Sequence, residues 1–296
     1  MNPIKIFTDT NCDIPKAIRE ENKIALINFS LYMDGKEIEI NPDWDIVDYK
    51  TLYNTLRAGE RIYILSTTEL EIKYKFSHYL KKGYDIIYIG CSGKQSKTLF
   101  KAQKVVEELK KEYPNNKIEV LDSLNASIGQ GLVVLNACKL NSEGLPFEEI
   151  IEKTSAMRKN VIQFATVETL TYLSKANRVN ARSAIFGNLF KVKPILISDI
   201  DGDQTAFLKV KGREESLNKI ADLFIENIIN PEEQEIYIMH GDDLESALYV
   251  KNRLLSSGLK FKNINIEVVG AVIGVSTGPG MVCIFGKGKE VTFKGK

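Results

Sequence analysis

The segment IKIFTDTNCDIP at residues 4–15 decides the fold, because it joins a β-rich run to a helix start. Residues 4–8 predict a strand. Asp13, followed two residues later by Pro15, predicts the N-cap and first turn of a helix that runs to about residue 22. A strand that leads directly into a helix is the opening of a βαβ unit.

The same alternation of strands and helices continues to about residue 160. Further strands are predicted at 62–65, 84–90 and 117–121, and helices at 70–82, from 98 onward, at 132–140 and at 146–157. The insertion at residues 24–40 alternates in hydrophobicity around Asp34-Gly35, which predicts an antiparallel hairpin. We therefore predict a mostly parallel α/β/α domain over residues 1–160.

The second half of the chain has a different character. Residues 161–167 predict a strand, and the strands predicted at 194–198 and 207–210 flank Asp201-Gly202-Asp203, which is typical of a hairpin. Two amphipathic helices follow, with apolar faces that begin at Leu217 and Leu244. An α+β domain is predicted over residues 161–296, so the fold class is α/β with a boundary near residue 160.

Composition and charge exclude several classes of function. The 296 residues are 44% hydrophobic and 27% charged, which is typical of a globular protein. Forty basic and 39 acidic side chains leave a net charge of +1, so no global field attracts nucleic acid or an anionic membrane. Asp9 comes too early for the apolar core of a signal peptide, and the apolar stretch 268–285 is interrupted. We expect a cytoplasmic protein without stable membrane insertion.

Hydroxyl side chains follow every strand predicted in the first half. They lie at residues 8–11, 66–68, 92–98 and 122–123. Hydroxyls and helix-start N–H groups donate hydrogen bonds to carboxylate or phosphate oxygens, which indicates a site for a small anionic head group. The same residue types are also ordinary helix N-caps, so each loop taken alone has a purely structural interpretation.

Catalytic and metal sites are poorly supported. His78 falls in a polar helix and His240 at a strand end, where a surface position and a structural hydrogen bond are expected. The loop 90–98 lacks the glycines of a nucleotide-binding loop, and the run Gly270–Gly274 is expected to open no helix, which excludes a dinucleotide fingerprint. The four cysteines have no CxxC spacing, so neither zinc nor a disulfide framework is predicted.

Taken in order, several segments resemble the DegV family of bacterial fatty-acid-binding proteins. The resemblance rests on Thr8 to Pro15, Asp34-Gly35, Asp122 to Gly131, Leu170 to Lys175 with Arg178, Gly187 to Leu196, Lys209 to Arg213 and Gly278-Pro279-Gly280. It implies a two-domain carrier that holds one long acyl chain in a buried tunnel between the domains, with no cofactor. In such relatives the loaded protein presents the carboxylate to a separate fatty acid kinase.

The resemblance also implies site residues. Ser66 or Thr67 would bond the carboxylate, Ser96 is the strongest single candidate, and Arg178 would be the cation near the mouth. Ser276 and Thr277 precede the terminal Gly-Pro-Gly and complete the set. Two positions depart from the family pattern: Ser276 replaces a histidine, which bears on presentation to the kinase, and Lys97 replaces a glycine and adds a charge there.

Two hypotheses follow. The first is a non-catalytic carrier of a long-chain fatty acid whose carboxylate is held by Ser and Thr hydroxyls. The second is a hydrolase or phosphotransferase that uses Asp9 and the strand-end hydroxyls on a small phosphorylated or carboxylated substrate. The second lacks an acid two residues beyond Asp9 to assist as acid and base.

Overall fold

The computed structural model describes residues 2–178 and 192–295. Their contacts divide the chain into two compact units: residues 1–46 with 63–158, and residues 47–62 with 159–296. The domain boundary near residue 160 stays a prediction; the contact-defined units also change at residues 158–159, and they assign residues 47–62 to the second unit. Each unit is described separately below.

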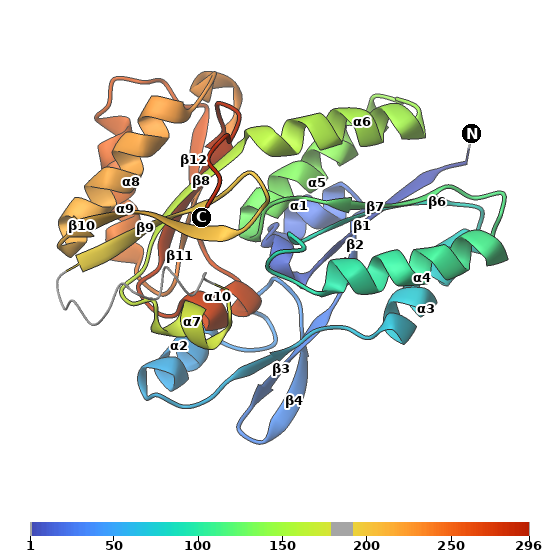
Figure 1. Ribbon diagram of the computed structural model, residues 1–296, viewed down its shortest axis with the longest axis horizontal. Helices are drawn as coiled ribbons and strands as arrows, with labels where there is room; N and C mark the ends of the chain where they lie inside the picture. The colour runs from blue at the N-terminus through green and yellow to red at the C-terminus, as the bar shows by residue number, and fades with distance from the viewer. Residues whose placement is uncertain (1, 179–191, 296) are drawn as a thin grey trace. The chain divides into compact units, whose positions relative to one another are not determined.

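The first unit is built on a parallel sheet with helices on both faces. Among the described residues its strand order is β2 (Ala25–Ile27), β1 (Ile4–Asp9), β6 (Asp85–Gly90) and β7 (Ile118–Asp122), all parallel. Figure 1 shows α3 (Glu69–Leu80) and α4 (Thr98–Glu112) on one face, and α5 (Ser127–Ser142) and α6 (Phe147–Met157) on the other. This confirms the predicted α/β/α architecture.

The core of this unit follows from the apolar spacing of its helices. Ile72, Phe76 and Leu80 lie one turn apart on α3 and are buried. They pack in one cluster with Phe7 and Tyr88 of the sheet and with the buried apolar face of α4. Burial of these two helical stripes against the sheet holds the layers together.

Two local predictions in this unit are wrong. Asp13 is not a helix N-cap: it adopts a left-handed conformation at the end of a 3-10 turn, and Pro15 caps α1 (Lys16–Glu21). The run 24–33 is not one strand, since β2 and β3 (Phe29–Met33) belong to different sheets. The Thr10 hydroxyl, buried beside this break, accepts a hydrogen bond from Phe29 N at 3.0 Å.

The strand predicted at 62–65 as part of the central sheet lies elsewhere. β5 (Tyr63–Leu65) pairs antiparallel with β3, which also pairs with β4 (Lys36–Ile40) in the predicted hairpin. These strands form a separate three-stranded sheet. The loop at residues 66–68 therefore does not follow a strand of the parallel sheet.

The second unit contains a mixed sheet. Among the described residues the strand order is β10 (Gln204–Lys211), β9 (Val192–Ser198), β8 (Val161–Thr166), β13 (Val282–Lys287), β11 (Glu235–His240) and β12 (Asn263–Val268). Every neighbouring pair is antiparallel except β11 and β12. The β9–β10 hairpin and the α+β character are as predicted. Helix α8 (Arg213–Asn227) buries the predicted apolar face that begins at Leu217. The face predicted from Leu244 is wrong for α9 (Leu244–Leu255), because this helix buries Ala247, Val250 and Leu254 instead and leaves Leu244 exposed.

Among its described residues the second unit also contains three shorter α-helices: α2 (Tyr49–Arg57), α7 (Thr171–Lys175) and α10 (Ala271–Thr277). Gly270 is the N-cap of α10, so the expectation that this glycine run opens no helix is wrong. Gly278, with a φ of 78°, ends the helix before Pro279 can interrupt it.

Helix α2 attaches to the second unit by packing and by charge. Tyr53 is fully buried, and its hydroxyl packs closely against Gly274. A Cβ atom added at Gly274 would lie only 2.6 Å from this hydroxyl. Lys50 and Arg57 form ion pairs with Asp242 at 2.5 and 2.6 Å. These contacts explain why a segment flanked by strands of the first unit belongs to the second.

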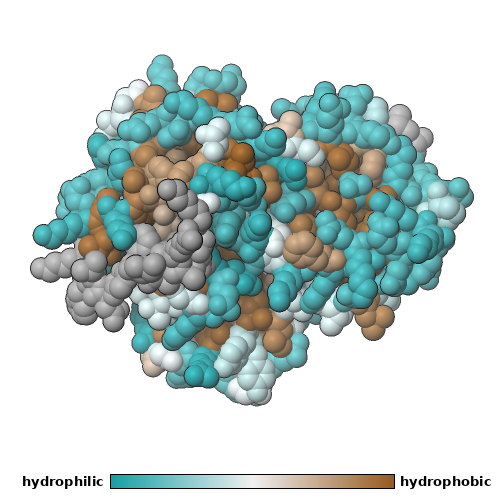
Figure 2. Space-filling model, viewed as in Figure 1, coloured by the Kyte–Doolittle hydropathy of each residue, from teal (hydrophilic) through white to brown (hydrophobic). Residues whose placement is uncertain are grey.

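Within the described residues, no helix combines the length and hydropathy needed to cross a membrane. The surface seen in Figure 2 is mainly hydrophilic, with hydrophobic residues in small groups.

Candidate head-group site

The carboxyl ends of β1, β6 and β7 meet at one edge of the parallel sheet, and the polar residues that follow them are buried. Asp9, Ser92 and Thr98 are completely buried, and Ser96 is 8% exposed. Buried polar groups require hydrogen-bond partners, so the partners decide which of these residues are available to a ligand.

Asp9 is saturated by donors from its own protein. Its Oδ1 accepts from Asn11 N, Asn11 Nδ2 and Gln130 Nε2 at 3.0, 2.7 and 3.2 Å. Its Oδ2 accepts from the Tyr88 hydroxyl at 2.6 Å and from Cys91 N at 3.4 Å. Burial and the neighbouring carboxylate raise the pKa of Tyr88 well above its usual value, which keeps this phenol a donor. Asp9 therefore fastens β1 to β6 and α5.

Other strand-end hydroxyls are also used internally. Thr8 donates to Ile89 O at 2.8 Å and accepts from Gln130 Nε2 at 2.8 Å. The Ser123 hydroxyl donates to Asn125 O at 3.0 Å, which shapes the loop after β7. The structural interpretation of the hydroxyl-rich loops is correct for these two residues.

The loop before α4 differs, because the hydroxyl protons of Ser96 and Thr98 are not donated to any described residue. Ser96 Oγ accepts from Thr98 N at 3.3 Å, and no described residue accepts its proton. Thr98 Oγ1 is fully buried and has no hydrogen-bond partner in the described structure. A buried hydroxyl without a partner costs about 1–3 kcal/mol, which a bound oxygen atom would recover.

The helix behind these two hydroxyls favours an anion. α4 has 15 residues, and its N-terminal N–H groups receive no side-chain cap from Lys97. The partial positive charge of a helix N-terminus and the Lys97 ammonium, in an exposed position, both favour negative charge nearby. Ser96 and Thr98 with this helix start form the candidate head-group site.

Ser66 and Thr67 are brought to α4 by a single lysine. Lys101, one turn after Thr98, donates to Ser66 Oγ at 2.8 Å and to Thr67 O at 2.7 Å. The Thr67 hydroxyl donates to Glu71 Oε2 at 2.9 Å. The hydrogen bond from Thr68 N lowers the pKa of Glu71 below its usual value. Both predicted residues thus lie beside α4; the Ser66 side chain has its partner on α4, and the Thr67 side chain has its partner on α3.

Arg178, Ser276 and Thr277 belong to the second unit, and each donates to a nearby carbonyl. Ser276 Oγ donates to Val272 O at 3.2 Å, and Thr277 Oγ1 donates to Ile273 O at 2.9 Å. Arg178 donates to Ala176 O at 2.8 Å. In the segment Gly187 to Leu196, residues 187–191 lie outside the described residues.

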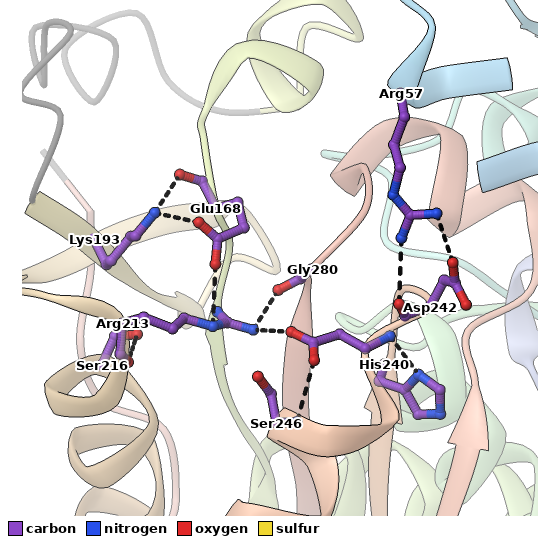
Figure 3. Close-up of polar contacts among 10 residues, drawn as sticks. Arg57, Glu168, Lys193, Arg213, Ser216, His240, Asp242, Ser246 and Gly280 are labelled. Carbon is purple, nitrogen blue, oxygen red and sulfur yellow. Dashed lines mark hydrogen bonds and ion pairs between the residues drawn. The ribbon is translucent and has the colours of Figure 1, made fainter. Parts of the chain in front are cut away.

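The second unit also contains a charged network that sequence reasoning did not predict (Figure 3). Arg213 pairs with Asp243 at 2.7 Å and with Glu168 at 3.1 Å, and it donates to Gly280 O at 2.6 Å. Lys193 pairs with the same Glu168. The basic residue Arg213 was visible in the sequence, but its acidic partners come from distant segments and carry no local signal.

The two histidines have the structural positions expected. His240 is buried, its Nδ1 accepts from Asp243 N at 3.1 Å, and burial lowers its pKa. His78 lies on α3 beside Lys82. The cysteines are buried thiols, and among the described residues no cluster of His, Cys, Asp or Glu could hold a metal ion.

The known proteins named below, which are similar to this chain, carry the name of one family. A family model described as "Uncharacterised protein, DegV family" matches residues 3–287. A DegV domain-containing protein of Clostridium perfringens is 30% identical over 285 residues, which cover 96% of this chain and 97% of the relative. A solved structure of a fatty acid binding DegV family protein from Streptococcus agalactiae is 25% identical with a TM-score of 0.85, over 98% of this chain and 100% of that one.

The fold match extends to a more distant protein. A DegV family protein from Thermus thermophilus, whose structure is described as showing fatty acid binding, has a TM-score of 0.85 at 22% identity. It covers 97% of this chain and 100% of its own. At this identity the likeness concerns the fold alone.

Proposed function

The chain belongs to the DegV family, and from that membership we propose that it binds a long-chain fatty acid as a non-catalytic carrier. The observation that carries the proposal is the buried, unpartnered hydroxyl of Thr98 beside Ser96 at the start of α4. Two hydroxyl donors in front of a helix N-terminus match the two oxygens of a carboxylate.

The neighbouring cations support the same assignment. Lys97 is at the N-cap of α4, and Lys101 holds the loop of Ser66 and Thr67 against that helix. In the proposal these two residues line the head-group site, and a small side-chain rearrangement lets Ser66 or Thr67 donate to the ligand. Arg178, Ser276 and Thr277 are proposed to contact the ligand from the second domain.

The acyl chain supplies most of the affinity in this proposal. Burying about fifteen methylenes at ~0.8 kcal/mol each gives roughly 12 kcal/mol before association costs are subtracted. A hydroxyl bond to a carboxylate contributes roughly 1.5–3 kcal/mol and mainly fixes orientation. We place the chain in a buried tunnel between the two domains, as the family resemblance implies.

The carrier is proposed to act in the cytoplasm and to present the carboxylate of its bound fatty acid to a separate kinase. Ser276, where the family pattern has histidine, donates to a carbonyl of its own helix. Any presentation step must therefore rely on groups other than an imidazole at this position.

The alternative hydrolase or phosphotransferase depends on Asp9, and the geometry argues against it. All five hydrogen bonds that Asp9 accepts come from the protein itself, and the residue is fully buried. A nucleophile or general base needs a lone pair directed at substrate.

Native mass spectrometry of the protein purified without added lipid tests the proposal. An added mass in the range of a long-chain fatty acid, lost on organic extraction, is the expected result. Protein that carries no such mass, and that takes up none when incubated with a panel of C14–C18 acids, would refute the carrier. Asp9-dependent turnover of phosphoester or thioester substrates would instead support the enzyme.

A further inference from the structure

Strand β12 ends the mixed sheet of the second unit, and no described strand pairs with its outer side. Val269 N donates to His240 O on β11, so in the alternating pattern of a strand Ile264, Ile266 and Val268 direct their backbone groups outward. Lys251 of α9 donates to Ile264 O at 2.8 Å, which agrees with this orientation. The remaining outward N–H and C=O groups form an open edge.

A stripe of exposed leucines lies on the helix beside this edge. Leu244, Leu248 and Leu255 of α9 are 53%, 44% and 55% exposed. Their spacing of four and seven residues places them on one flank of the helix. Tyr249 and Arg253 face α8 through hydrogen bonds to Asn218 and Asp222, so the leucines lie on the opposite flank, where Lys251 reaches β12.

Two other described edge strands, β10 and β2, differ from β12. β10 is an edge strand with a register shift between Ala206 and Leu208 and lysines at 209 and 211. β2 has only three residues. β12 pairs with β11 over all six of its residues without a break, which makes it a regular template for another strand.

We propose that β12 and the leucine stripe of α9 form a homodimer interface, with a second copy of this chain as the occupant. Two copies of β12 pair antiparallel about Asn265, which extends both sheets into one. In this register Ile264 faces Ile266 of the partner subunit, and Asn263 faces Glu267 of the partner subunit. The amide can donate to the carboxylate, and no two like charges of the strand residues stand opposite one another. Ile264 O has two lone pairs, so it accepts both from Lys251 Nζ and from the N–H of Ile266 of the partner subunit.

The helices are correctly spaced for the same arrangement. α9 packs over β11 and β12, since Ala247, Val250 and Leu254 share a core cluster with Ile236 and Ile264. With strands about 4.8 Å apart, the two α9 helices lie about 10 Å apart on one face of the extended sheet, which is a normal helix-packing distance. Lys251 lies beside Ile264, so Leu248 is about level with Asn265 and nearest the two-fold axis. A single two-fold rotation that relates the two copies thus covers both the open edge of β12 and the exposed leucines of α9.

Sedimentation velocity of the full chain over a concentration series tests the proposal. The wild type is expected to dimerise reversibly, with a Kd on the order of 1–100 μM for an interface of this modest size. L248E is expected to raise the Kd at least about 100-fold, because each copy brings a carboxylate to the two-fold axis. L70E, at the 77% exposed Leu70 of α3, is the matched control and should leave the Kd unchanged.

Hydrogen exchange gives a second readout that does not depend on variants. Exchange of the Ile264 and Ile266 amides should slow as the protein concentration rises through the Kd, while amides of β10 should not change. A wild type that stays monomeric up to about 1 mM overturns the proposal. A dimer that L248E and L70E affect equally, or that leaves the β12 amides unprotected, overturns it as well.

Discussion

Replacing Thr98 by valine should weaken ligand binding while making the empty protein more stable. The Thr98 hydroxyl is fully buried and has no partner in the described structure, so the ligand-free protein bears the cost of its desolvation. Valine keeps the shape of threonine and removes the polar atom. We expect the free energy of unfolding to rise by roughly 1–3 kcal/mol.

The ligand-bound protein should show the opposite effect. A hydrogen bond to a carboxylate contributes roughly 1.5–3 kcal/mol, so its loss should raise the Kd for a fatty acid roughly 10- to 150-fold. Affinity is measured by competitive displacement of a fluorescent fatty acid, and stability by urea unfolding of delipidated protein. S96A should reduce both quantities, because Ser96 also accepts from Thr98 N.

Thr154 provides the matched control. It is also fully buried, but its hydroxyl accepts from Asn136 Nδ2 at 3.4 Å. T154V should lower the unfolding free energy by about 0.5–1.5 kcal/mol and leave the affinity unchanged. If T98V is less stable than wild type, or binds fatty acid as tightly, the hydroxyl is not reserved for a ligand and the head-group assignment fails.

Three further predictions concern the framework. D9N should lower the unfolding free energy by roughly 2–4 kcal/mol in urea denaturation, because one carboxylate oxygen that accepts from donors becomes an amide donor; wild-type stability would contradict the saturated role of Asp9. Burial opposes ionisation of Asp242, yet the hydrogen bonds from Lys50 and Arg57 leave its pKa below the usual value. A carboxylate whose pKa is lowered in the folded state contributes stability above about pH 4, and this stability is lost as the pH falls through the folded-state pKa. The protection of the α2 amides against hydrogen exchange should therefore fall in that pH range. D242N should remove this pH dependence of the protection. G274A should lower the free energy of unfolding by about 1–3 kcal/mol, because its Cβ would lie 2.6 Å from the Tyr53 hydroxyl. In a double-mutant cycle Y53F should recover part of that loss. Equal losses in the wild-type and Y53F backgrounds would contradict this packing.

Local patterns in the sequence predict most elements but not the partners of short strands. The apolar stripe of α4 and the β9–β10 hairpin are encoded by spacing alone, and they are correct. For α3 the sequence predicts a polar helix, and it does not predict the buried stripe at Ile72, Phe76 and Leu80. β5 was recognisable as a strand, yet three residues contain no information on whether they pair with β6 or with β3. Pairing is decided by contacts between distant segments.

The candidate site shows the same limit. Ser96 is one of several hydroxyl residues that follow predicted strands, and it is the resemblance to the DegV family that makes it the strongest single candidate. Thr98 stood in the same segment, but only coordinates reveal that its hydroxyl lacks a partner. Ser66 and Thr67 lie beside α4 through Lys101, which is 35 and 34 positions away along the chain, respectively, and no local motif encodes this contact.

The attachment of α2 to Asp242 has a consequence for folding on the ribosome. Lys50 and Asp242 are 192 positions apart, so at about 5–20 residues per second the helix is synthesised roughly 10–40 s before its anchor. During that interval the strands on either side of α2 can already assemble, while Tyr53 has nothing to cover it. A nascent chain arrested before residue 242 should therefore expose this aromatic ring to chaperones and proteases.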